Sequence, residues 1–181
     1  MIYDLPKQLV VDGEPLDIRS DFRAALDIIT ALSDPNLSDR EKEQVFLKIL
    51  YVEPYKILNR IEALEKGMWF LSGGEDDSPD SKSKPQLMDW EQDFRLIVSP
   101  VNRVLGYECR ERDYLHWWTF LGAYMEIGEC TFSTVCRIRA KQAKHQKLEK
   151  YEKDYLKDNY DIVILKKKFS DDDKAFIDEI I

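Results

Sequence analysis

The chain has 181 residues, of which 44% are hydrophobic and 34% are charged, and its formal net charge at pH 7 is −8. This length allows one domain with a sizeable core or two small domains. The excess of acidic residues disfavours non-specific attraction to nucleic acid or to acidic membrane surfaces. The longest apolar stretch is shorter than the roughly 20 residues that cross a bilayer, so no membrane segment is expected.

The use of cysteine and histidine argues against a disulfide framework and against a metal site. The three cysteines form no CxxC pair, and the two histidines lie far apart in the sequence. The N-terminal residues 1–6 have neither a basic region nor the apolar core of a signal peptide. These features predict a cytoplasmic setting, with no cofactor and no metal ion.

The first half of the chain predicts a small hairpin followed by three helices. Residues 8–18 form the hairpin, because Asp12-Gly13 suits a turn with positive φ. The first helix is expected over about 21–31. The second begins at a capping box formed by Ser38 and Glu41 and ends at the break at Glu53-Pro54, and the third runs from there to about Leu71.

Residues 72–86 contain none of the aliphatic or aromatic side chains that build a core. Such a segment cannot bury enough apolar surface to offset the entropy lost on ordering. It predicts a mobile loop.

The second half predicts further helices. The first begins after Asp89, contains Trp90 and ends at Gly106, and a long one-sided helix runs from about Thr131 towards 166–168. The prediction for the whole chain is a mainly α-helical protein of about six or seven helices. Residues 1–168 are expected to form one domain and residues 169–181 an acidic tail.

Between these helices, residues 114–127 are apolar almost all the way round a helix. A helix with one face in water needs an apolar stripe of only about 100°, so this one is expected to be core, an assembly surface, or both. Adjacent helical residues project about 100° apart. We therefore expect one of Trp117 and Trp118 in the core and the other at an edge that binds a partner. Gly122 would allow close approach of a neighbouring helix.

The sequence contains no motif that supports enzymatic activity. Asp89, Glu91 and Asp93 surround Trp90, but this spacing suits the first turn of a helix, where the helix dipole stabilises negative charge. The sequence has no Gly-rich phosphate loop, nucleophile elbow, zinc-protease motif or kinase motif. We expect no enzymatic activity.

Residues 137–150 are strongly basic, with six Lys or Arg residues and one Glu. One interpretation is a nucleic-acid-binding arm, in which Tyr151 and Tyr155 stack on bases. The other is a solvated helical face that balances an acidic partner or the protein's own acidic half. The overall negative charge favours the second interpretation.

Several segments resemble the bacteriophage gene-product-fifteen family. They are residues 87–98, 102–107 and 115–128 (LHWWTFLGAYMEIG), together with 20–23 and 68–74 before the acidic loop. The resemblance covers most of residues 1–168. Members of this family occur in long-tailed phages and in prophages of Gram-positive bacteria, and their genes usually lie just upstream of the tape-measure gene.

The resemblance implies a non-enzymatic tail assembly chaperone in the cytoplasm of the host bacterium. Such a protein would bind the tape-measure protein and keep it soluble until the tail tube polymerises around it. An upstream tail assembly protein and further copies of this chain are expected as additional partners. The alternatives are a structural component of the virion, such as a tail-completion or connector protein, and, less favoured, a nucleic-acid-binding regulator that uses residues 137–150.

A chaperone for an extended helical client needs an apolar groove flanked by charge. We expect aromatic side chains to form that surface and basic side chains to select the client by charge. The aromatic candidates are Trp90, Trp117, Trp118, Phe120 and Tyr124, and the basic candidates are Arg137, Arg139, Lys141 and Lys144.

Overall fold

The computed structural model describes residues 4–75 and 85–172. The chain divides into two compact units. The first comprises Met1–Ser78, Tyr114–Leu121 and Lys168–Ile181, and the second Pro79–Asp113 and Gly122–Lys167. The described residues form eight α-helices and one two-stranded sheet, which confirms the mainly α-helical prediction.

The first unit begins with the predicted hairpin. Strand β1 (Gln8–Val11) pairs antiparallel with β2 (Glu14–Asp17). Asp12 and Gly13 have φ angles of 51° and 79°, as the two-residue turn requires. One face of β1 is buried and packs on α3 (Arg60–Leu71).

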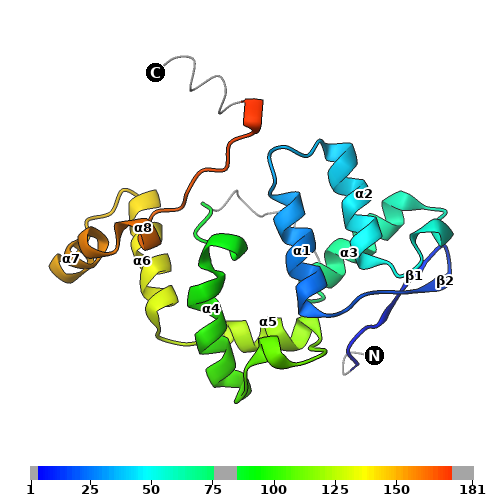
Figure 1. Ribbon diagram of the computed structural model, residues 1–181, viewed down its shortest axis with the longest axis horizontal. Helices are drawn as coiled ribbons and strands as arrows, with labels where there is room; N and C mark the ends of the chain where they lie inside the picture. Colours follow the sequence, from blue (N-terminus) through cyan, green and yellow to red (C-terminus); the bar gives the residue numbers. More distant parts are fainter. Residues whose placement is uncertain (1–3, 76–84, 173–181) are drawn as a thin grey trace. The chain divides into compact units, whose positions relative to one another are not determined.

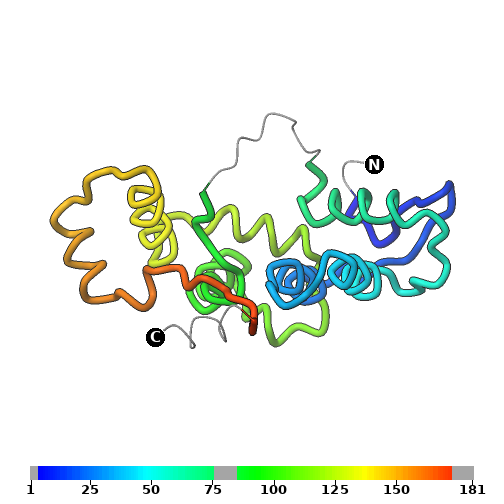
Figure 2. Tube along the Cα trace, turned by 90° about the horizontal axis from the view of Figure 1, so that it is seen from above, coloured from blue at the N-terminus to red at the C-terminus, as the bar shows by residue number. Residues whose placement is uncertain are grey.

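Three helices build most of the first unit. They are α1 (Phe22–Leu32), α2 (Asp39–Leu50) and α3, with the 3₁₀ turn η1 (Pro54–Lys56) between the last two. Figure 1 shows them side by side, and Figure 2 shows α1 and α2 end on, next to each other. Each helix begins where an oxygen-bearing side chain accepts a hydrogen bond from its first turn, as predicted at Ser38.

A glycine sets the distance between α2 and α3. A Cβ atom on Gly67 would lie 2.5 Å from Cε1 of Phe46 and 2.7 Å from Cδ2 of Leu50. Both neighbouring side chains are fully buried and have little space to move. The side chains of α2 therefore rest directly on the backbone of α3.

Helix α5 (Trp117–Met125) is shorter than predicted. Residues 114–116 are not helical, because this stretch pairs with the chain before α1. The amide of Phe22 donates to Leu115 O at 2.9 Å, and the amide of Trp117 donates to Ser20 O at 2.8 Å. Residues up to Leu121 belong to the first unit and residues from Gly122 to the second, so α5 is shared between the units.

The second unit is built from four helices and a 3₁₀ turn, together with the end of α5, which contains Tyr124. The elements are α4 (Trp90–Leu105), η2 (Cys109–Glu111), α6 (Thr131–Ala143), α7 (Lys150–Asp158) and α8 (Tyr160–Val163). Helix α4 begins after Asp89 and ends at Gly106, whose φ is 77°, and both boundaries agree with the prediction.

The single long helix predicted after Thr131 is wrong, because the structure has three helices there. Helix α6 ends at Ala143, and His145 has a φ of 53°, which breaks the helical backbone. Helix α7 then begins after Glu149, whose amide donates to Glu152 Oε2 at 2.8 Å. The turn after α6 allows apolar side chains from the segment that follows it to pack against α6 and α8. Leu148, Tyr155 and Leu156 pack against Val135, Ile138 and Val163.

Two predictions concern residues at the limits of the described chain. Of the expected loop over 72–86, residues 76–84 lie outside the described residues, and the described ends are neither helix nor strand. The division into a domain over 1–168 and a tail over 169–181 stays a prediction, and residues 173–181 lie outside the described part. None of the described helices combines the length and apolar content that crossing a membrane requires.

The substitution Gly67→Ala is expected to destabilise the first unit. The added methyl group must displace buried side chains of α2, and overpacking of this kind costs about 1–3 kcal/mol. Urea unfolding followed by circular dichroism measures the change in the free energy of unfolding.

The matched control is Gly122→Ala in α5, where a Cβ atom meets nothing within 4 Å. Alanine has a higher helix propensity than glycine, so we expect no loss of stability at this position. Equal destabilisation by both substitutions would contradict the close approach at Gly67. Among the described residues, no neighbouring helix makes the close approach predicted at Gly122.

Candidate functional site

The two adjacent tryptophans of α5 bind the end of α3. Trp117 Nε1 donates to Leu71 O at 2.9 Å, and Trp118 Nε1 donates to Phe70 O at 2.8 Å. The last carbonyl groups of a helix have no partner within it. Trp117 supplies a donor to Leu71 O, and Trp118 adds a second donor at Phe70 O, which also accepts the Gly73 amide at 3.2 Å. Trp117 is 1% exposed, whereas Trp118 is half-buried and packs edge-on against Trp69.

Phe120 is fully buried in the core of the first unit. Its ring stacks on Phe22 with centroids 4.6 Å apart, and it also packs against Trp117 at 5.9 Å. Trp117 and Phe120 therefore offer almost no surface to a partner in this structure. Trp118 keeps part of its surface, which matches the expectation that one tryptophan is core and the other is nearer the edge.

His116 caps the first turn of α5 from a buried position. Its Nδ1 accepts the amide of Trp118 at 3.0 Å, so Nε2 carries the proton and donates to Pro6 O at 2.9 Å. Burial lowers the pKa of His116, which keeps the ring neutral. Protonation of Nδ1 would remove the acceptor for the Trp118 amide.

The remaining aromatic candidates meet in the second unit. Trp90 and Tyr124 have ring centroids 4.9 Å apart, and Tyr124 also lies 6.0 Å from Phe132. The Tyr124 hydroxyl donates to Met88 Sδ at 3.1 Å, and burial raises its pKa to about 12. Trp90 and Tyr124 are half-buried, so each retains some exposed surface.

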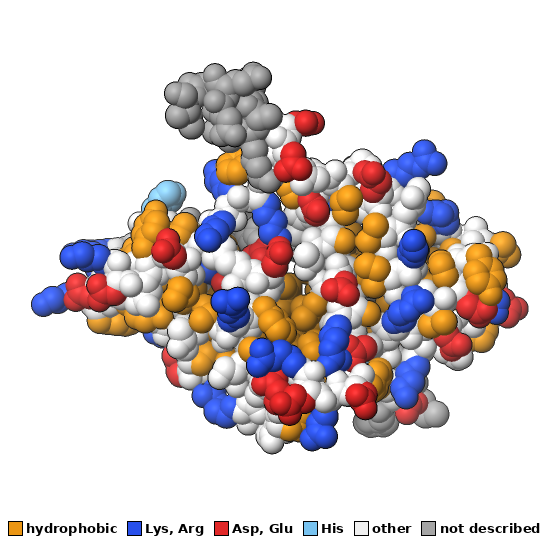
Figure 3. Space-filling view, in the orientation of Figure 1, with side chains coloured by type: hydrophobic (Ala, Val, Ile, Leu, Met, Phe, Trp, Pro, Cys, Tyr) orange, Lys and Arg blue, Asp and Glu red, His pale blue; other side chains and the backbone are white. Residues whose placement is uncertain are grey.

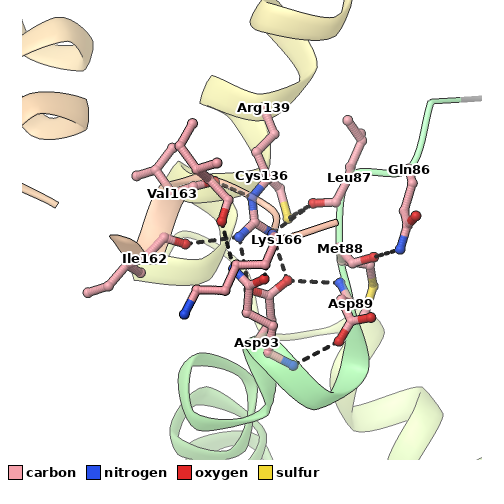
Figure 4. Close-up of polar contacts among 12 residues, drawn as sticks. Gln86, Leu87, Met88, Asp89, Asp93, Cys136, Arg139, Ile162, Val163 and Lys166 are labelled. Carbon is pink, nitrogen blue, oxygen red and sulfur yellow. Dashed lines mark hydrogen bonds and ion pairs between the residues drawn. The ribbon is translucent and has the colours of Figure 1, made fainter. Parts of the chain in front are cut away.

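Arg139 is a buried clamp rather than a surface cation (Figure 4). Its guanidinium pairs with both carboxylate oxygens of Asp93, at 2.6 and 3.0 Å. It also donates to carbonyl oxygens, at 2.6 Å to Val163, 3.0 Å to Leu87 and 2.9 Å to Ile162. All five N–H donors are thus used, and α4, α6, α8 and the segment before α4 are held together.

Two more basic candidates pair with a buried acid. Lys141 Nζ lies 2.7 Å from both carboxylate oxygens of Glu152, whose side chain is fully buried. This bond, with the Glu149 amide, lowers the pKa of Glu152. Arg137 lies 3.5 Å from Glu129 and 3.8 Å from Glu152. Of the four basic candidates, Lys144 is the one with an exposed side chain.

An open groove in the first unit was not predicted from the sequence. Its volume is about 920 Å³. Its apolar lining includes Ile18, Ala24, Ile49, Val52 and Tyr114, and its charged lining is Lys7, Asp17, Arg19, Asp21, Asp27 and Lys48. On the face shown in Figure 3, apolar side chains reach the surface between basic and acidic ones in the region of α1 and α2.

Local contacts hold the groove in shape. Nη1 of Arg19 donates to the carbonyl oxygens of Lys48, Ile49 and Tyr51 at 3.0, 3.0 and 2.7 Å, which fixes the end of α2. The hydroxyl groups of Ser20 and Tyr114 are 2.8 Å apart. Val52 and Tyr114 remain 45% and 48% exposed. The groove therefore presents a preformed apolar surface with three basic and three acidic side chains around it.

Within the described residues, no three His, Cys, Asp or Glu side chains lie where they could hold a metal ion together. The described surface offers for recognition the groove and, among the aromatic candidates, the partly exposed rings of Trp90, Trp118 and Tyr124.

The substitution Arg139→Met is expected to lower the free energy of unfolding by about 3–5 kcal/mol, because it leaves Asp93 as a buried unpaired charge. Arg139→Lys should fall between this variant and the wild type, since one ammonium group cannot replace five donors. Urea unfolding measures both. The control is Lys144→Met, an exposed substitution that should change stability by less than about 0.5 kcal/mol. An unchanged Arg139→Met variant would refute the clamp.

Lowering the pH from 7.5 to 5.5 is expected to destabilise the protein through His116. In the unfolded chain histidine binds a proton near pH 6.5, whereas burial lowers the pKa of His116 in the folded state. The unfolded state then binds more protons than the folded state. The free energy of unfolding therefore decreases as the pH is lowered, by at most about 1.4 kcal/mol per pH unit. Urea titrations at each pH measure this slope.

His116→Asn removes the titrating group and should flatten the slope between pH 7.5 and 5.5, whatever its effect on stability at neutral pH. His145→Ala removes the other histidine and is the control: a slope that is lost in His116→Asn and kept in His145→Ala assigns it to His116. A slope that survives in His116→Asn would contradict the assignment.

Comparison with known families supports the resemblance of the tryptophan-rich segments. The family model described as Bacteriophage Gp15 protein matches residues 2–165. No curated protein and no solved structure gives a match. The family model covers nearly the whole chain and points to a phage protein concerned with the structure or assembly of the particle. The chain belongs to the bacteriophage Gp15 protein family.

Proposed function

We propose that this protein is a non-enzymatic tail assembly chaperone that binds the tape-measure protein in the cytoplasm of the host bacterium. Family membership supports a role in phage structure or assembly. The observation that carries the finer proposal is the groove of the first unit, whose apolar lining stays exposed between acidic and basic side chains.

The groove suits an amphipathic helix from an extended client. Such a helix places apolar residues at positions i, i+3, i+4 and i+7 on one face, and Ile49, Val52 and Tyr114 offer an apolar surface for that face. Both charge types line the groove, so flanking charges of either sign on the helix find opposite partners. A balanced set of this kind favours long client segments of mixed charge over strongly charged ligands.

The aromatic candidates contribute to this proposal in different ways. Trp117 and Phe120 act from inside, because they hold the core of the first unit on which the groove is built. Trp118, Trp90 and Tyr124 keep partial exposure and serve as secondary contacts. The ion pairs of Arg137, Arg139 and Lys141 argue against the alternative of a nucleic-acid-binding regulator.

Co-expression with the tape-measure protein tests the proposal. The wild-type protein is expected to keep this client in the soluble fraction and to co-purify with it. Val52→Glu places a charge on the apolar lining and should weaken binding at least tenfold, since an interface loses about 1.4 kcal/mol or more. Affinity is measured by titrating a soluble client segment against each variant.

Val104→Glu is the matched control, because Val104 is 41% exposed on α4 and does not line the groove. It should bind like the wild type. An insoluble client with no binding to the wild-type protein would refute the proposal. Stoichiometric amounts of the protein in purified virions, measured by mass spectrometry, would instead favour a structural virion component.

A further inference from the structure

The last residues of the sequence have an amphipathic pattern of their own. Residues 170–181, here called the C-terminal segment, read SDDDKAFIDEII. Phe176, Ile177, Ile180 and Ile181 stand at positions i, i+1, i+4 and i+5, which fall on one side of a helical wheel. This is the kind of apolar face that the groove of the first unit is proposed to accept from a client.

The start of the C-terminal segment is attached to the first unit. The amide of Asp171 donates to Oδ1 of Asn36 at 2.8 Å, and Lys168–Ile181 belongs to that unit. Asn36 lies in the loop between α1 and α2, and the groove is formed further along the same two helices. The segment therefore begins at one end of the helix pair that carries the groove.

The nine residues that follow Asp172 are long enough to reach the groove. They span about 14 Å as a helix and up to about 30 Å when extended, whereas the whole of α1 is about 16 Å long. The groove lining includes Asp27, halfway along α1. A chain that starts at Asn36 and follows α1 brings its apolar residues 176–181 to the groove.

The charges of the segment and of the groove follow the same order along α1 and α2. In the segment, Lys174 comes before the acidic pair 178–179. In the groove, Asp27 lies nearest to the α1–α2 loop, whereas Arg19 and Lys48 lie towards the far ends of the two helices. The basic residue of the segment is thus placed for Asp27, and its acidic pair for Arg19 and Lys48.

The far end of the groove has basic side chains available for this pairing. Arg19 donates to carbonyl groups, and within the described residues neither Arg19 nor Lys48 forms an ion pair with a carboxylate. The acids at that end already have partners. Asp21 pairs with Arg23 at 3.1 Å, and Asp17 accepts a hydrogen bond from a side-chain amide at 2.7 Å.

We propose that the C-terminal segment docks in the groove of its own first unit and thereby competes with the client. The competition rests on the proposed function of the groove, whereas the docking concerns this chain alone. A segment joined to its site by a short connection acts at an effective concentration on the order of millimolar. If the separate peptide binds with a dissociation constant of about 100 μM, the attached segment lowers the affinity for a client about tenfold.

Titration of a labelled peptide of residues 170–181 against full-length variants tests the docking. Ile177→Asp and Ile180→Asp, combined in one open variant, remove the apolar side of the chain's own segment. The peptide should bind this variant with a dissociation constant of about 100 μM and the wild type about tenfold more weakly, as measured by fluorescence anisotropy. Adding Val52→Glu to the open variant should weaken binding at least tenfold, whereas adding Val104→Glu should leave it unchanged.

Ala175→Asp is the matched control, because residue 175 lies opposite the apolar side on a helical wheel. This variant should exclude the peptide as the wild type does, and circular dichroism verifies that each variant folds. An open variant that leaves the peptide unbound at about 1 mM would overturn the proposal. Peptide binding that survives Val52→Glu would overturn it as well, because the segment would then dock outside the groove.

Titration with a soluble client segment separates this proposal from that of the groove's function. The open variant should bind the client about tenfold more tightly than the wild type. Equal affinities of the two proteins for the client would contradict the competition. A client that binds neither protein would refute the function proposed for the groove, while the peptide titration would still decide whether the segment docks there.

Discussion

The hydrogen bonds from Trp117 and Trp118 to the last carbonyl groups of α3 are the contacts on which the first unit depends. They hold the start of α5 against the end of α3, and this placement brings Phe120 onto Phe22 in the core. Short helices leave a large share of their carbonyl groups without partners. The same need is met elsewhere by Arg19 at the end of α2 and by Arg139 at α8. Long side chains with N–H donors thus hold separate helices together by their ends.

Features with local causes could be predicted from the sequence. The turn at Asp12-Gly13, the capping box at Ser38 and the end of α4 at Gly106 each depend on a few neighbouring residues. The ends of the aromatic helix and of the long basic helix depend on distant partners. Residues 114–116 are held by backbone bonds to residues 20–22, and the turn after α6 lets later apolar residues reach Val135 and Ile138. Helical periodicity alone carries no information on either contact.

The candidate site was harder to predict, because residue type does not reveal exposure. Arg139 sits four positions after Val135 and directly after Ile138, so a helical wheel places it on the core face, and this was the available signal for its burial. No comparable signal identifies the groove. Its lining comes from residues as distant as Lys7, Lys48 and Tyr114, none of which is unusual where it stands in the sequence.

The residues that stand out in the sequence, tryptophan and arginine, are therefore not the ones that form the exposed apolar surface. Tryptophan and arginine are the residues most enriched at the centres of tight interfaces, but Trp117 and Arg139 are buried inside their own units. The apolar part of the groove lining is mostly aliphatic, and side chains such as Ile49 and Val52 each contribute about 1.5–3 kcal/mol when fully buried. Contacts of this strength form readily and also release. A chaperone must give up its client once the tail tube has formed, so a weakly binding aliphatic surface suits the proposed function better than aromatic anchors would.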